Sequence, residues 1–185
     1  GGKLNRRTTE DLVQLIELAG EQWLFYKAFP IQVAFLRGTT ADPSGNITME
    51  REALTLDNLA MAMAARNSKG LVIVQVERIA AAGSLNPRQV QIPGILVDCV
   101  VVARPENHMQ TYATAYSPAY SAEVRVPAES VPALPLDLRK IIGRRAAMEL
   151  AVNSVVNLGI GMPEAVAAVA AEEKSLDYVT LTTDP

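Results

Sequence analysis

The chain has 185 residues, 49% of them hydrophobic and 5% aromatic, which is enough for an aliphatic core. Its formal net charge of -3 at pH 7 gives no general attraction to nucleic acid or to an anionic membrane, and no stretch approaches the about 18 uninterrupted apolar residues of a membrane span. With one cysteine and one histidine, the chain has no internal disulfide and is a poor candidate for a zinc site or a Ser-His-Asp triad.

Helices and strands are predicted to alternate along the first half of the chain. Residues 9–19 predict a helix, because apolar side chains recur at helical spacing after a threonine that can cap it. Short apolar runs bounded by proline or glycine predict buried strands at residues 31–36 and 71–76. Residues 54–66 predict a second helix. The expected core face of this helix carries Leu56, Leu59, Ala60, Met63 and Ala64.

Turn-forming residues separate these elements. Residues 42–46 read D-P-S-G-N, which predicts a turn, and residues 47–49 continue extended. Asn86 is expected to cap a short helical turn that begins at the following proline. Residues 95–103 predict the next strand, in which we expect Cys99 to be a buried thiol.

The pattern breaks after residue 103. Residues 104–135 are rich in proline and tyrosine, which predicts a connector with little regular structure that packs on a domain surface. His108 lies in this stretch, and we expect it to have a surface or packing role.

Regular structure is predicted again from Asp137, which caps a helix extending to about residue 151. Residues 154–158 and 178–182 predict strands, and residues 163–173 predict the helix between them. The alternation of strands and helices predicts an α/β fold with a largely parallel sheet.

Residues 155–164 read V-V-N-L-G-I-G-M-P-E, so an apolar strand ends in Gly-x-Gly and a proline opens an alanine-rich helix. Glycines let a ligand approach the backbone closely, and a helix start offers unpaired N–H groups. This arrangement predicts a site for an anionic or thioester-bearing ligand. Gly159 and Gly161 would line the site, and Asn157 and Glu164 would orient groups in it. Tight packing alone is the alternative role of the glycines.

Further motifs lie on both sides of this stretch. Residues 38–50 read G-T-T-A-D-P-S-G-N-I-T-M-E, residues 83–87 read G-S-L-N-P, and residues 92–98 read I-P-G-I-L-V-D. These motifs resemble the first domain of the family I CoA-transferases. Residues 144–150 (R-R-A-A-M-E-L) and 157–163 (N-L-G-I-G-M-P) resemble the opening of the second domain. The resemblance covers nearly the whole chain and is greatest to the fused acetate/propionate CoA-transferase group.

The resemblance implies three-layer α/β/α domains with largely parallel sheets, present only in part. Residues 1–103 match the later part of the first domain, residues 104–136 form a Pro/Tyr-rich connector, and residues 137–185 match the first part of the second domain. We therefore expect this chain to behave as an internal fragment, either as a homo-oligomer or associated with the remaining segments of the enzyme, in the cytoplasm.

The resemblance also implies a reaction. In the family, a glutamate after a strand reading T-L-T-x-E attacks an acyl-CoA, forms an acyl anhydride and then carries coenzyme A as a thioester. Coenzyme A is a substrate, and neither a cofactor nor a metal is implied. Residues 180–184 read T-L-T-T-D, so Asp184 takes the nucleophile's position with a carboxylate ~1.5 Å shorter in reach. Gly38, Thr39 and Thr40 are expected to contribute to substrate binding.

The implied partners are acyl-CoA and small carboxylic acids such as acetate, propionate or butyrate, with no nucleic acid and no membrane. Two alternatives remain open. The aspartate at position 184 fits a catalytically impaired or non-catalytic chain of a CoA-transferase assembly. Gly159 and Gly161 fit a nucleotide- or sugar-phosphate-binding α/β domain, although Glu164 stands where the G-x-G-x-x-G pattern has its last glycine.

Overall fold

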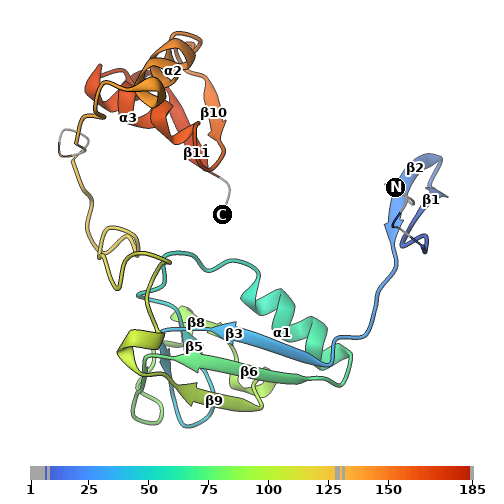
Figure 1. Cartoon of the computed structure of the whole chain (residues 1–185). Helices are drawn as coiled ribbons and strands as arrows, with labels where there is room; N and C mark the ends of the chain where they lie inside the picture. Colours follow the sequence, from blue (N-terminus) through green and yellow to red (C-terminus); the bar gives the residue numbers. More distant parts are fainter. Residues whose placement is uncertain (1–6, 8, 128–129, 131, 184–185) are drawn as a thin grey trace. The chain divides into compact units, whose positions relative to one another are not determined.

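A computed structural model describes residues 7, 9–127, 130 and 132–183 of the chain. The chain forms two compact units, one made of residues 1–49 and 57–104 and the other of residues 50–56 and 105–185 (Figure 1). The short segment 50–56 therefore belongs to the second unit although both of its flanks belong to the first. The predicted division at residues 103 and 136 stays a prediction.

The first unit is built on a three-stranded parallel sheet in which β6 (Leu71–Val76) lies between β3 (Val33–Arg37) and β9 (Cys99–Val102) (Figure 1). Alternate residues of β6, among them Val72 and Val74, are fully buried on one face, as expected of a strand rich in β-branched residues. Both early strand predictions are confirmed. The third strand begins later than predicted, because Gly94–Leu96 forms a 3-10 turn (η2) before it.

A smaller four-stranded sheet packs against the same core. Its order is β7 (Arg78–Ile79), β4 (Thr40–Ala41), β5 (Ile47–Thr48) and β8 (Val90–Ile92). The 3-10 turn η1 (Pro87–Gln89) precedes β8 and is capped by the Asn86 side chain, as predicted.

The turn predicted at residues 42–46 joins β4 to β5 and is confirmed. The Asp42 carboxylate accepts hydrogen bonds from the backbone N–H groups of Ser44 at 2.9 Å and Asn46 at 3.0 Å. The Asn46 side chain in turn accepts a 2.9 Å hydrogen bond from the N–H of Gly94. Only glycine fits at position 94, because a Cβ there would lie 2.0 Å from the carbonyl oxygen of Ser44.

Helix α1 (Asn58–Asn67) covers the core side of the sheet and buries Asn58, Ala62 and Ala65. The predicted core face is wrong, since its residues are all exposed: Leu56, Leu59, Ala60, Met63 and Ala64. The small alanine side chains let the helix axis approach the strands closely. The larger apolar residues Leu59 and Met63 therefore lie on the outer face of α1, and Leu56 precedes the helix.

Residues 9–19 do not form the predicted helix. Strand β1 (Val13–Leu18) pairs antiparallel with β2 (Glu21–Tyr26) in a hairpin. Ala19 and Gly20, the two residues between the strands, both have positive φ values, 55° and 83°. Tight hairpins favour this geometry because its twist matches that of the strands. The aromatic residues of β2 add cross-strand contacts that an isolated helix would not have.

The second unit contains a parallel pair of strands, β10 (Val155–Leu158) and β11 (Thr180–Thr183), with helices α2 (Leu138–Ala147) and α3 (Glu164–Glu172). A 3-10 turn, η5 (Leu176–Tyr178), leads into β11. The strands and helices predicted here are confirmed, with shifted ends.

Helix α2 begins where predicted, because Asp137 accepts a 2.9 Å hydrogen bond from the N–H of Lys140. It packs on α3 at Gly143, where a Cβ would lie 2.9 Å from the Cβ of Ala165. The Lys140 ammonium is buried and bonds to the Glu172 carboxylate at 2.8 Å. The helix thus has a fixed contact face, and its larger apolar residues point away from it.

The connector is held by the segment 50–56. The side chain of Gln110 donates to the Arg51 carbonyl at 2.8 Å, and the Arg51 guanidinium lies 3.8 Å from the centre of the Tyr116 ring. His108 is buried with its Nε2 3.3 Å from the Glu52 carboxylate, so it has a packing role. The connector also contains a 3-10 turn, η3 (Pro105–Asn107).

The α/β class with largely parallel sheets is confirmed, but one face of the β3–β6–β9 sheet is apolar and exposed. Phe35 is 79% exposed, Leu71 54% and Val101 45%. Cys99 pairs with Ile73 on this face and is exposed, so the prediction of a buried thiol is wrong. The apolar run around Cys99 is typical of a strand in a sheet that is covered on both faces. In the described part of the chain, this face is not covered.

The exposed faces predict that the isolated 185-residue chain associates. Large apolar side chains are exposed on the β3–β6–β9 sheet and on the outer sides of α1 and α2, and large exposed apolar patches are rare on monomers. We expect oligomers or aggregates in sedimentation velocity at micromolar concentration. A monodisperse, cooperatively unfolding 19.9 kDa monomer would contradict this prediction.

Candidate active site

The carboxyl ends of β10 and β11 bring two polar side chains together. The strands are parallel, with Asn157 opposite Thr182 and Leu158 opposite Thr183. The Thr182 hydroxyl donates a 3.0 Å hydrogen bond to the side-chain oxygen of Asn157. This bond orients the Asn157 amide at the edge of the sheet where ligands of α/β proteins usually bind.

Asp184 follows directly after Thr183 in the sequence and lies outside the described residues. The strand that should precede the nucleophile is present and ends beside Leu158. The role of Asp184 as nucleophile stays a prediction.

The glycines of the loop after β10 differ in what they require. Gly161 has φ +96°, a backbone conformation that residues with a side chain rarely adopt. Gly159 has no such φ, and a Cβ there would meet no described atom closer than the Pro163 ring at 4.0 Å. Neither conformation nor packing among the described residues demands glycine at position 159. The expected role of Gly159 and Gly161 in lining a ligand site stays a prediction.

Glu164, the first residue of α3, binds this loop. Its Oε1 accepts from the N–H of Gly161 at 3.1 Å, and its Oε2 accepts from Arg139 of α2 at 2.8 Å. The hydrogen bond from Gly161, and next that from Arg139, hold the pKa of Glu164 below the ordinary glutamate range. The carboxylate is therefore ionised near neutral pH and suited to orienting the loop, and it is a poor proton donor.

Gly38, Thr39 and Thr40 lie in the first unit, between β3 and β5. Thr39 and Thr40 are buried, and a Cβ on Gly38 would lie 2.2 Å from a side-chain methyl of Ile47. The N–H of Thr39 donates to the carbonyl of Thr48 at 2.8 Å. These contacts give the three residues a packing role, and their expected contribution to substrate binding stays a prediction.

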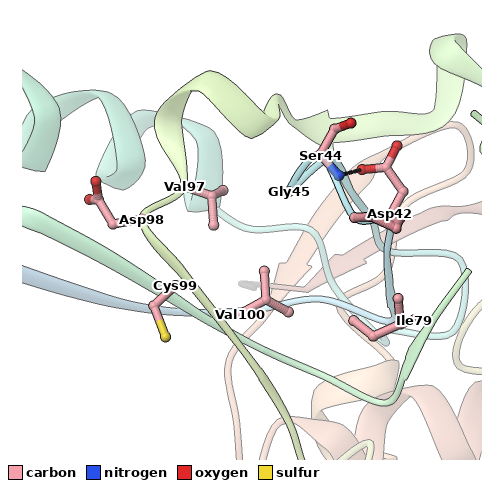
Figure 2. A pocket seen from close by; sticks show the side chains of 9 residues that line it. Asp42, Ser44, Gly45, Ile79, Val97, Asp98, Cys99 and Val100 are labelled. Carbon is pink, nitrogen blue, oxygen red and sulfur yellow. Dashed lines mark hydrogen bonds between the residues drawn. The ribbon is translucent and has the colours of Figure 1, made fainter. Parts of the chain in front are cut away.

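The first unit also contains an open cavity of about 390 Å³ beside the Asp42 turn (Figure 2). Its lining residues are Asp42, Pro43, Ser44, Gly45, Ile79, Val97, Asp98, Cys99 and Val100. Both carboxylates are engaged within the protein. Asp42 bonds to its own turn, and Asp98 accepts from the N–H of Val72 at 2.8 Å and from Arg66 at 2.5 Å. The carboxylates therefore stabilise turns and strand ends.

Two residues of the site were not predicted from the sequence. Thr182 was assigned only to a strand, and the strand register shows its contact with Asn157. Arg139 stands near the start of α2, far along the chain from Glu164, and no local pattern reveals the pair. Among the described residues, no cluster of three or more His, Cys, Asp or Glu side chains is arranged to hold a metal ion. None of the helices in this part of the chain has the length and apolar character of a membrane span.

Comparison with known proteins identifies the class to which this fold and site belong. Residues 4–103 match the family described as coenzyme A transferase, and the chain belongs to this family. The predicted family resemblance is thereby confirmed.

The chain is 52% identical over 185 residues to the caffeate CoA-transferase of Acetobacterium woodii. It is 38% identical over the same length to the acetate CoA-transferase YdiF of Escherichia coli K12. The crystal structure of YdiF from Escherichia coli O157:H7 in a thioester complex with CoA is similar with a TM-score of 0.83 and 36% identity over 97% of this chain. The chain spans about a third of these relatives, 34–35% of their length.

The Asp42 turn predicts a pH dependence of stability. The Asn46 side chain, and then the N–H groups of Asn46 and Ser44, lower the pKa of Asp42 in the folded state. A group of this kind stabilises the fold above its unfolded pKa, and this stabilisation is lost as the pH falls through the lower folded pKa. The free energy of unfolding should therefore decrease below about pH 4.

Asp42→Asn should lower stability at neutral pH and flatten this acidic decrease, as measured by denaturant unfolding of the full-length protein between neutral and acidic pH. Asp57→Asn is the matched control, because the Asp57 side chain makes no capping hydrogen bond at α1. Equal pH slopes for the Asp42→Asn variant and the unmodified protein would refute the assignment.

Proposed function

We propose that this chain is part of an enzyme that transfers coenzyme A between an acyl-CoA and a carboxylic acid. Membership of the coenzyme A transferase family supports the reaction class. The observation that carries the proposal is the β10–β11 edge. There, the Asn157–Thr182 pair and the Gly159 backbone stand next to the strand end that precedes Asp184 in sequence.

The proposed reaction proceeds through bonds to the Asp184 carboxylate. Its oxygen attacks the thioester carbonyl, the C–S bond breaks, and an acyl anhydride and CoA thiolate result. The thiolate then attacks the enzyme's side of the anhydride, which releases the first acid as a carboxylate and leaves an enzyme–CoA thioester. A second carboxylate reverses these steps. The thioester complex with CoA described for the YdiF relative supports such an intermediate.

Each tetrahedral step develops negative charge on a carbonyl oxygen, so the site needs donors aimed at that oxygen. We propose that the backbone N–H groups at Gly159 and the oriented Asn157 amide donate hydrogen bonds to the reacting carbonyl oxygen. The family resemblance implies neither a metal nor an organic cofactor, and we propose the same for this chain.

The phosphate-binding alternative is disfavoured by the start of α3. A nucleotide phosphate at a Gly-x-Gly loop binds the free N–H groups of the helix N-terminus. Here the Glu164 carboxylate already accepts the N–H of Gly161 and would repel a phosphate at that place. The non-catalytic alternative depends on whether Asp184 reaches its target, which the next experiment decides.

Asp184 is tested by mass spectrometry of the full-length protein after exposure to acyl-CoA. We expect a CoA adduct on Asp184 that forms slowly, because the aspartate carboxylate sits ~1.5 Å behind that of a glutamate. Asp184→Glu should raise turnover by roughly 10²-fold, and Asp184→Ala should abolish the adduct. An adduct on another carboxylate, or turnover that Asp184→Ala leaves intact, would show that the nucleophile lies elsewhere.

The acid substrate has two candidates. The aliphatic composition and the acetate CoA-transferase relative favour short acids such as acetate, propionate and butyrate. The caffeate CoA-transferase relative, with 52% identity, favours a larger aromatic acid. We propose short acids with moderate selectivity, because an apolar pocket discriminates by only ~1–3 kcal/mol per methylene.

A substrate panel separates the two candidates. Acetate, propionate, butyrate, cinnamate and caffeate are offered to the full-length protein, and kcat/KM is measured for each with a common CoA donor. Short acids should differ from one another by about 10- to 200-fold at most per methylene. A value for caffeate or cinnamate above all the short acids would assign the aromatic class instead.

We further propose that the protein works as a homo-oligomer or in association with further segments of the enzyme, in the cytoplasm. The exposed apolar face of the β3–β6–β9 sheet supports the association. Sedimentation of the full-length protein, and fractionation of the cells that contain it, test the two parts separately.

A further inference from the structure

Gly161 is held by its N–H and its carbonyl group at once. Its N–H donates to Glu164 Oε1 at 3.1 Å, and its carbonyl oxygen accepts from Arg139 Nη2 at 3.0 Å. The same Nη2 donates to Glu164 Oε2 at 2.8 Å. These three contacts form a closed ring that joins α2, the loop and the first residue of α3. We call this ring the Gly161 latch.

The guanidinium in the latch comes from a helix whose position is fixed independently. Asp137 caps α2, and Gly143 lets the helix lie against α3 without a side chain between them. Lys140 reaches Glu172 and Arg144 reaches Glu173, both near the far end of α3. The contacts of α2 therefore hold Arg139 in place next to the loop.

The loop needs such a restraint because of its composition. A glycine at φ +96° has access to other backbone conformations that a larger residue would not enter. Rotation of the peptides on either side of Gly161 would redirect the N–H and carbonyl groups of the loop. Since the proposed reaction uses the loop backbone near Gly159, such rotation would misplace the donors.

We propose that Arg139 is a positioning residue for coenzyme A transfer, which acts through Gly161 and Glu164 on the loop that follows β10. This inference rests on the proposed function. Arg139 itself contacts the loop and Glu164, and the loop contacts the reacting group.

The latch is partly open to solvent, with side-chain exposures of 43% for Arg139 and 55% for Glu164. Exposed ion pairs contribute little to global stability. Loss of Arg139 should therefore change the loop and the chemistry while leaving the overall fold in place. This separates a positioning role from a structural one.

The test compares Arg139→Ala, Arg139→Lys and Glu164→Gln in the full-length protein. The matched control is Arg145→Ala, which removes another exposed arginine of the same helix that pairs with Glu149. Hydrogen exchange of peptides covering residues 158–165 reports on the loop, thermal unfolding reports on the fold, and kcat and KM for acid exchange report on the chemistry.

Arg139→Ala should raise loop exchange by roughly 10-fold and lower kcat by about 10- to 10²-fold, with KM and the unfolding midpoint near those of the unmodified protein. Arg139→Lys should have a kcat between those of Arg139→Ala and the unmodified protein, because lysine keeps the positive charge and hydrogen-bond donors but lacks the planar guanidinium. Glu164→Gln should resemble Arg139→Ala, and Arg145→Ala should match the unmodified protein.

The proposal is overturned if Arg139→Ala and Glu164→Gln leave loop exchange and kcat unchanged, or if kcat falls only in proportion to a loss of global stability. If Arg139→Ala fails to fold, Glu164→Gln decides by the same two measurements. Absence of acid exchange in the unmodified protein would remove the proposed function and the catalytic part of this inference. The hydrogen-exchange data would still show whether the latch orders the loop.

Discussion

The parallel pairing of β10 with β11 is the constraint on which the candidate site depends. Parallel partners end at the same edge of a sheet and need a crossover between them, so residues distant in sequence meet there. The crossover here contains α3, whose buried residues Val166 and Val169 attach it to the second unit. The pairing brings the Thr182 hydroxyl within hydrogen-bonding distance of the Asn157 side chain. It also places the start of the loop after β10 beside the end of β11. A slip of one residue would turn Asn157 to the other face and separate the pair.

The start of α3 determines which chemistry this edge favours. A helix N-terminus attracts anions, and in many glycine-rich loops that anion is the ligand's phosphate. In this chain an internal carboxylate, Glu164, takes that place and is itself neutralised by Arg139. The loop is left with backbone groups in a fixed orientation and no net demand for an anion at its helix end. Such an environment suits a polarised carbonyl that becomes negative only during reaction.

Local signals in the sequence predicted several turns and helix caps, because each depends on a few neighbouring side chains, although the threonine expected to cap a helix at residues 9–19 precedes a hairpin. The Asp42 turn, the Asn86 cap and the Asp137 cap are examples. Signals that depend on what an element packs against were less reliable. The β1–β2 hairpin carries an apolar pattern that also fits a helix, and its partner strand decides between them. Helix α1 packs through alanines, which the spacing of its larger residues concealed.

The candidate site shows the same division. The Gly-x-Gly loop and its neighbours Asn157 and Glu164 were recognisable from the sequence, because a strand, two glycines and a helix start are consecutive. The contributions of Thr182 and Arg139 were not, since each reaches the loop through tertiary structure, by strand register and by the packing of α2 on α3. The structure adds that Glu164 binds the loop, and its expected role in orienting groups of the ligand stays a prediction.

The latch and the aspartate at position 184 impose a joint requirement on the proposed mechanism. An aspartate reaches ~1.5 Å less far than the glutamate of the family pattern, so the reacting carbonyl and the carboxylate must come closer by another route. The loop offers little of this movement, because both backbone groups of Gly161 are held. The substrate cannot easily shift either, if its carbonyl is bound by that loop. The loop therefore does not compensate for a shorter carboxylate, which makes the length of the side chain at position 184 decisive for the proposed mechanism.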